Sequence, residues 1–229
     1  MWGKLLHKLF TSNVPELVLS TIIPVLFLVF MIKDRQSKHI LSFFCWGIFS
    51  VLLAFVLNEW AVLSTGNSER LTTSIAPIIE ETLKALPLLL IFMNNKVFDK
   101  KLVIYCAMAS GIGFSIQETL FYVSSLSIES GLQSILPVLI RTLTTCLMHG
   151  MSTAVIGFAI TVTANYKDVR IPMIMGMLAL SATIHSLFNR LISTRLAVFA
   201  MLLPAVLYFI GLLLSDSFEE DNASSKVIV

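Results

Sequence analysis

Long hydrophobic runs separated by short polar segments dominate the pattern of this 229-residue chain. Each run is close to the roughly 20 residues that a helix needs to cross a hydrocarbon core of about 30 Å. No run alternates between polar and apolar positions in the way that a half-buried strand does. The pattern therefore predicts an all-α protein, a polytopic helix bundle of about seven transmembrane helices in a single integral membrane domain. The predicted spans cover residues 14–32, 40–63, 72–93, 102–126, 134–164, 171–192 and 196–214, and a polar tail covers residues 215–229.

The composition narrows the class of protein further. Hydrophobic residues make up 56% of the chain and charged residues 13%, whereas about 25% of the residues of a soluble domain are charged. These values exclude a soluble globular protein and a disordered chain. The formal net charge of +2, with its lysines and arginines scattered, argues against a nucleic-acid partner. The lipid bilayer is the expected surrounding of most of the chain.

Lysine and arginine residues are unevenly distributed between the two ends of the predicted spans. One end collects nine of them (Lys33, Arg35, Lys38, Lys96, Lys100, Lys101, Lys167, Arg170 and Lys226), and the opposite end collects five (Lys4, Lys8, Arg70, Arg190 and Arg195). Because positively charged loops stay in the cytoplasm, this distribution predicts an external amino end and a cytoplasmic carboxyl tail.

Ionisable residues interrupt the third predicted span, which carries Glu80, Glu81 and Lys84. Each charge near the centre of a transmembrane helix costs about 2.5–3.5 kcal/mol, while each Leu, Ile or Phe returns only about 0.3–0.6 kcal/mol. This helix is therefore expected to face the interior of the bundle. There, Glu80 and Lys84 can pair, since they are four residues apart on one helix face.

Three further spans each carry polar residues on one helix face. The fourth span carries Glu118, the fifth carries Arg141 and His149 at helical spacing, and the sixth carries His185 and Asn189 one turn apart. From a rise of 1.5 Å per residue, the carboxylates and the two histidines of these spans (Glu80, Glu81, Glu118, His149 and His185) lie about 10–21 Å below the outer edge of the bilayer. We therefore expect them to meet in one cavity in the outer half of the membrane.

Hydrolysis of a peptide bond is a reaction that this set of residues can perform. It needs an activated water, a general base, a proton donor for the leaving amine and a stabiliser of the oxyanion. Glu80 or Glu81 is the predicted base, and Lys84 and Arg141 are predicted to tune the charge of the site. The remaining roles fall to the other polar residues: His185 with Asn189 stabilises the oxyanion or donates the proton, and Glu118 and His149 complete the site.

A zinc site is a second interpretation of the same residues. Two histidines and one carboxylate with an open fourth position are a catalytic zinc composition, and Glu118, His149 and His185 supply it. The chain has no H-E-x-x-H motif, so the ligands would have to come from separate helices.

Two other functions stay open at this point. Carboxylates and histidines within the membrane also mark ion pathways, so a proton-coupled transporter is an alternative, although no pair of broken helices in two repeated halves is visible. A membrane scaffold without catalytic activity is a third interpretation, in which the charged residues of the third span form a buried structural ion pair.

Four short motifs resemble those of the PrsW-type intramembrane proteases, in the same order and spacing. They are EETLK at Glu80 to Lys84, FSIQE at Phe114 to Glu118, the stretch from Arg141 to His149, and HSLFN at His185 to Asn189. That family is similar in turn to the CAAX-processing and bacteriocin-immunity group of glutamate-dependent membrane endopeptidases. The resemblance runs over roughly residues 14–214.

The resemblance implies a multi-pass protease or metalloprotease of the bacterial inner membrane. Its expected partner is a membrane-anchored protein, an anti-sigma factor, which it cuts first on the extracytoplasmic side. Glu80 and Glu81 match the paired glutamates of the family, Glu118 matches the glutamate of the second motif, and His149 and His185 match the two histidines. The last motif often ends in Asp where this chain has Asn189, which leaves a hydrogen-bonding role but not a charged ligand.

Overall fold

The computed structural model describes residues 14–31, 37–66, 74–93, 99–125, 132–164, 166–192, 194 and 198–207, and all secondary structure within these ranges is helical. The helices are α2 (Val14–Met31), α3 (Ser37–Thr65), α5 (Ala76–Met93), α6 (Lys100–Ser125), α7 (Leu132–Val162) and α8 (Lys167–Ile192). A shorter apolar helix, Val198–Leu207, follows α8. The predicted all-α fold class is confirmed.

The number of membrane spans is supported only in part. Among the described residues, three helical stretches are long and apolar enough to cross a membrane: Lys38–Ser64, Ile135–Val162 and Asp168–Ile192. Helix α5 carries three charged residues within its 18 positions, which lowers its hydropathy. The seventh predicted span extends past residue 207, and the polar tail lies outside the described residues. The prediction of one membrane domain stays a prediction.

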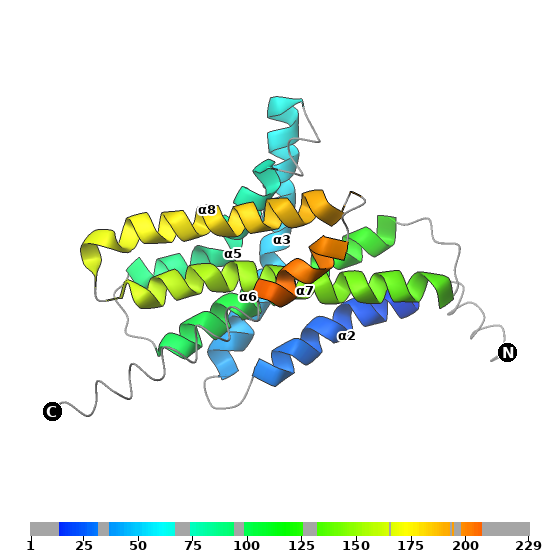
Figure 1. Ribbon diagram of the computed structural model, residues 1–229, viewed down its shortest axis with the longest axis horizontal. Helices are drawn as coiled ribbons and strands as arrows, with labels where there is room; N and C mark the ends of the chain where they lie inside the picture. Colours follow the sequence, from blue (N-terminus) through cyan, green and yellow to red (C-terminus); the bar gives the residue numbers. More distant parts are fainter. Residues whose placement is uncertain are drawn as a thin grey trace.

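Helix α7 lies at the centre of the bundle. An apolar stretch of 18 residues in α7 is 78% buried, against 33% for the corresponding stretch of α8. Its neighbours are α6, α8, α2 and α5. Figure 1 shows α7 and α8 running side by side, while α3 crosses them steeply and projects beyond α8 at its carboxyl-terminal end. Side chains from α5, α6 and α8 can therefore reach the same stretch of α7.

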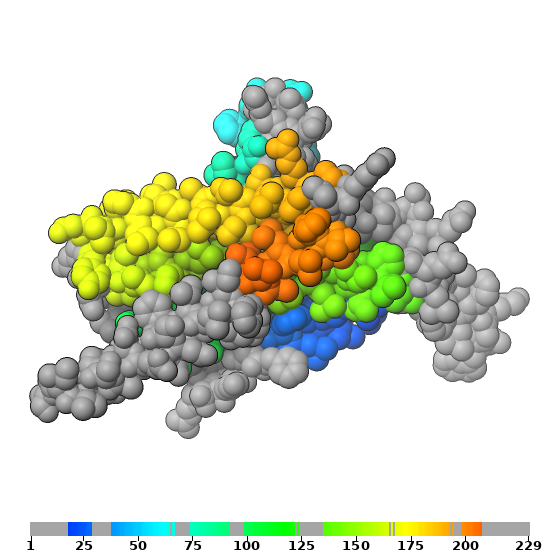
Figure 2. Space-filling view, viewed as in Figure 1, coloured from blue at the N-terminus to red at the C-terminus, as the bar shows by residue number. Residues whose placement is uncertain are grey.

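The outer surface of the described helices is strongly apolar. On α8 and the helix that follows it, large hydrophobic side chains are exposed, including Ile171, Met175, Val198 and Phe199. These two helices cover much of the face seen in Figure 2. An apolar surface of this kind suits a lipid surrounding, and the interior of the described helices combines an apolar core with many buried polar side chains.

Small residues allow α6 to approach its neighbours closely. A Cβ atom added at Gly111 would overlap the backbone carbonyl of His149 on α7, and one at Gly113 would overlap the carbonyl of Phe44 on α3. Close backbone contact through glycine is a common way to pack helices in membranes. The glycine at position 111 therefore fixes the distance between α6 and the part of α7 that carries His149.

We expect Gly111→Ala to destabilise the protein by about 1–3 kcal/mol, because the new methyl group pushes α6 away from α7. Gly176→Ala is the matched control, since a Cβ atom at Gly176 on α8 meets nothing within 4 Å. Alanine there should leave stability unchanged or raise it slightly. Thermal unfolding of both variants in the same detergent measures the difference, and equal midpoints for the two would contradict the prediction.

Candidate functional site

Four ionisable side chains are buried together inside the bundle. Glu81 and Lys84 on α5 and His149 on α7 are 0% exposed, and His185 on α8 is 1% exposed. Charges removed from water this completely need partners of opposite charge or hydrogen bonds to satisfy them. The helices that carry them provide both.

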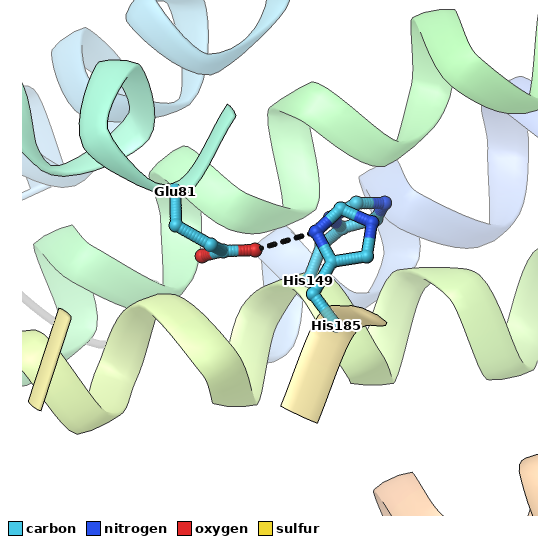
Figure 3. A group of neighbouring side chains, drawn as sticks. All are labelled: Glu81, His149 and His185. Atoms are coloured by element: carbon cyan, nitrogen blue, oxygen red, sulfur yellow. Dashed lines mark hydrogen bonds and ion pairs between the residues drawn. The ribbon is translucent and has the colours of Figure 1, made fainter. Parts of the chain in front are cut away.

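The carboxylate of Glu81 accepts hydrogen bonds from side chains of three helices. Its Oε1 lies 2.5 Å from Lys84 Nζ on the same helix and 2.9 Å from His185 Nδ1. Ser181 Oγ lies 2.9 Å from Oε2, and Ser152 Oγ lies 3.1 Å from both oxygens. Figure 3 shows the Glu81 carboxylate pointing at the imidazole of His185. The surrounding donors hold this carboxylate in one orientation.

Lys84 also determines which nitrogen of His149 carries a proton. Its Nζ lies 2.8 Å from His149 Nδ1, and an ammonium group has hydrogens to donate but no lone pair. Nδ1 is therefore the acceptor, and Nε2 carries the proton that is donated to Glu118 Oε2. Arg141 Nη2 lies 3.8 Å from Glu118 Oε1 on the other side.

Glu80 has different neighbours from Glu81. Its Oε1 accepts a hydrogen bond of 3.4 Å from Asn58 Nδ2 on α3, and its Oε2 lies 3.7 Å from His185 Nε2. The side chain of Glu80 is 15% exposed. His185 therefore lies between two carboxylates: its Nδ1 donates to Glu81, and its Nε2 faces Glu80.

The predicted pairing of Glu80 with Lys84 is wrong. Lys84 pairs with Glu81, three residues earlier, because Ser152 and Ser181 hold the Glu81 carboxylate on the side of α5 that faces α7 and α8. Consecutive residues of a helix are about 100° apart, so Glu80 turns towards α3 instead.

Seven of the eight predicted site residues form one connected set, which we call the polar chain. In order of contact, it consists of Glu80, His185, Glu81, Lys84, His149, Glu118 and Arg141. The eighth, Asn189, is half-buried one turn beyond His185 on α8. The catalytic roles assigned to all eight residues stay predictions.

The sequence does not single out two serines of the site, and it marks Phe114 only as the first residue of the FSIQE motif. Ser152 and Ser181 bind Glu81, and the ring of Phe114 covers Lys84, with the ring centroid 4.9 Å from Nζ. Ser152 follows His149 by three residues, and Ser181 precedes His185 by four, so each serine shares a helix face with a predicted site histidine. That shared face is a weak signal of the two serines, because a serine can also bond to the backbone of its own helix.

A metal ion would find suitable ligands in this arrangement. Glu81, His149 and His185 each offer one ligand atom, and these atoms lie within 4.8 Å of one another. Two imidazoles and one carboxylate suit zinc. The predicted set contained Glu118 in place of Glu81, and Glu118 instead contacts His149 from the side of Nε2.

Removing one serine from the Glu81 contacts is expected to destabilise the protein. Ser152→Ala or Ser181→Ala deletes a hydroxyl that faces a buried carboxylate, and a hydrogen bond to a charged group contributes about 1.5–3 kcal/mol. Thr183→Ala is the control, because Thr183 is exposed on α8 and donates only to the Ala179 carbonyl of its own helix. Unfolding in detergent measures all three variants. Stabilities of the serine variants equal to that of the control would contradict the prediction.

Comparison with known proteins identifies the family. A family model described as PrsW family intramembrane metalloprotease matches residues 35–215, which include α3, α5, α6, α7, α8 and every predicted site residue. No curated protein and no solved structure matches the chain. The match does not favour the transporter alternative. The chain therefore belongs to the PrsW family of intramembrane metalloproteases, which makes it a membrane hydrolase that acts on the peptide bonds of membrane-embedded proteins.

Proposed function

We propose that the polar chain is the active site and that Glu80 activates the attacking water. The arrangement of His185 between two unlike carboxylates carries this proposal. Glu81 is fully buried and accepts hydrogen bonds from several donors, whereas Glu80 is partly exposed and 3.7 Å from His185 Nε2. That separation is too long for a direct hydrogen bond, and a water molecule can bridge it. A water held there would lie beside the carboxylate that takes its proton.

The other residues of the chain have supporting roles in this proposal. Glu81 fixes His185 with its protonated Nδ1 inward, so that Nε2 faces Glu80 and the substrate. A histidine held in this way can take up a proton and pass it to the leaving amine. Asn189, one turn further along α8, is proposed to donate a hydrogen bond to the oxyanion. Arg141 and Glu118 hold His149 from its other side.

We further propose zinc as the metal that the family description implies. Glu81, His149 and His185 would hold it, and it would polarise the scissile carbonyl as a Lewis acid. With His185 as a ligand, the proton that Glu80 takes from water would pass from Glu80 to the leaving amine. The donor set supports zinc over calcium or magnesium, which prefer oxygen ligands alone.

The proposed substrate is a membrane-anchored anti-sigma factor, which the enzyme cuts first, on the extracytoplasmic side of a bacterial inner membrane. The support is the resemblance of the four motifs, together with the family match over residues 35–215. We also propose that the protein is multi-pass, with the spans given above.

Incubation of the purified protein with a tagged single-span substrate in proteoliposomes tests this function. We expect a discrete fragment, located by mass spectrometry, that disappears in the variant with both Glu80→Ala and Glu81→Ala. Retained cleavage by that variant would remove the proposal. A pH-gradient flux assay in the same vesicles tests the transporter alternative, and a substrate with an unrelated membrane segment tests the preference for anti-sigma factors.

A further inference from the structure

We propose that the Lys84 ammonium and a divalent metal ion compete for the same donor atoms of Glu81 and His149. In this arrangement, Lys84 provides the positive charge that a bound metal would otherwise supply. The inference concerns metal binding and does not depend on which residue activates water. Its test measures zinc binding, so it can fail while the peptidase proposal stands, and the reverse.

The contacts of Lys84 carry the first step. Its Nζ lies 2.5 Å from Glu81 Oε1 and 2.8 Å from His149 Nδ1, and the side chain is 0% exposed. Glu81 and His149 are two of the three residues whose ligand atoms cluster within 4.8 Å. A compact cation thus already bonds to two of the three candidate ligand residues. The Phe114 ring lies against the same ammonium, so the cation is enclosed and has no contact with solvent.

Both nitrogens of His149 are already engaged, so a metal must displace one of two partners. Binding at Nδ1 would displace Lys84 and bring in Glu81 and His185. Binding at Nε2 would break the contact with Glu118 and leave Lys84 where it is. The contacts favour the first case, because Nδ1 and Glu81 Oε1 both bond to the same Lys84 Nζ, at 2.8 and 2.5 Å, whereas Nε2 faces Glu118.

The serines that bind Glu81 also support metal binding at His149 Nδ1. Ser152 and Ser181 contact the carboxylate independently of Lys84, so they would continue to orient it after the ammonium had left. Carboxylate ligands of metals are commonly held by such hydrogen bonds. Removal of Lys84 would leave Glu81 buried without a cation, and metal binding would restore one.

Zinc binding by Lys84→Met therefore tests the competition. The full-length protein in detergent is stripped of metal with a chelator, and the dissociation constant and stoichiometry for zinc are measured by equilibrium dialysis. We expect Lys84→Met to bind one zinc ion about tenfold or more tightly than the wild type. Lys101→Met, which removes an exposed lysine at the start of α6, should behave like the wild type. Zinc affinity in Lys84→Met that is equal to or weaker than in the wild type overturns the proposal.

Three further variants locate the zinc. Adding Glu81→Gln to Lys84→Met should abolish the gain, because the carboxylate ligand is lost. Glu118→Gln retains Lys84 and the buried ion pair, so it avoids the risk that Lys84→Met fails to fold. With the metal at Nδ1, Glu118 only accepts the Nε2 proton of a ligand, so Glu118→Gln should weaken zinc binding by about 10–100-fold, and Glu81→Gln, which removes a ligand, should weaken it more. A larger loss in Glu118→Gln than in Glu81→Gln would assign the metal to the Nε2 side and overturn the proposal.

Discussion

Replacing Glu80 by glutamine is expected to slow peptide-bond cleavage by a factor of about 10²–10⁴ and to leave the fold intact, because an amide cannot take a proton from water. The amide of glutamine is nearly the same size as the carboxylate. Its oxygen can still accept the hydrogen bond from Asn58. Glu80 is also partly exposed, so its charge contributes less to the stability of the bundle than the buried charge of Glu81 does.

Initial rates on a single-span substrate, with the thermal midpoint measured on the same preparation, decide the outcome. Glu59→Gln is the matched control, since Glu59 is exposed near the end of α3 and lies next to Asn58 in the chain. It should cleave at the wild-type rate. A Glu80→Gln protein that is folded and keeps more than about a tenth of the activity would mean that another group activates the water.

The sequence predicts that the site residues meet inside the bundle, for one physical reason. An ionisable residue in a long apolar segment must avoid lipid, so Glu81, His149 and His185 had to face the interior of any bundle they belong to. Three buried groups on three helices of a small bundle then have few places to lie except near one another. The hydrophobic runs were equally informative, as the predicted span 40–63 lies within α3 and the span 171–192 lies within α8.

The choice of partners within the site could not be predicted in the same way. Sequence spacing allows Lys84 to reach Glu80 or Glu81 equally, because residues three and four apart both share a helix face. The rotation of α5 about its axis decides between them, and that rotation depends on contacts from other helices, among them those of Ser152 and Ser181 with Glu81. A serine in a membrane helix can satisfy its hydroxyl on its own backbone, so its sequence position gives little indication of a partner on another helix.

The number of membrane spans shows a second limit. Hydropathy assigns a span wherever about 20 residues are apolar on average, and this rule assumes that each helix faces lipid. Helix α5 packs instead against α3, α6, α7 and α8. Its three charged residues are compatible with the membrane only through those contacts, so its sequence alone does not specify how it is inserted.

Replacing both Glu81 and Lys84 by uncharged residues should separate the effect of this buried pair on stability from its effect on cleavage. We expect Glu81→Met or Lys84→Met alone to lower the free energy of unfolding by about 3–5 kcal/mol, because each leaves its partner buried without a counter-charge. The double variant should recover most of that loss, since two methionines fill a similar volume without charge. The hydroxyls of Ser152 and Ser181 can then donate to the backbone carbonyls of His149 and Ser152, which already lie 3.1 and 2.8 Å away.

Cleavage should not recover with stability in the double variant. Without Glu81, nothing in the described contacts holds Nδ1 of His185, and without Lys84 His149 loses its donor at Nδ1. Unfolding by denaturant in mixed micelles gives the coupling energy of the pair from the four proteins of the cycle, and the substrate assay gives their rates. A double variant that regains both stability and activity would make the pair a structural element alone. A double variant that is stable and inactive would show that a costly buried charge pair is kept for the chemistry of the site, by orienting two histidines or by supplying the Glu81 ligand, since apolar residues could hold the same helices together.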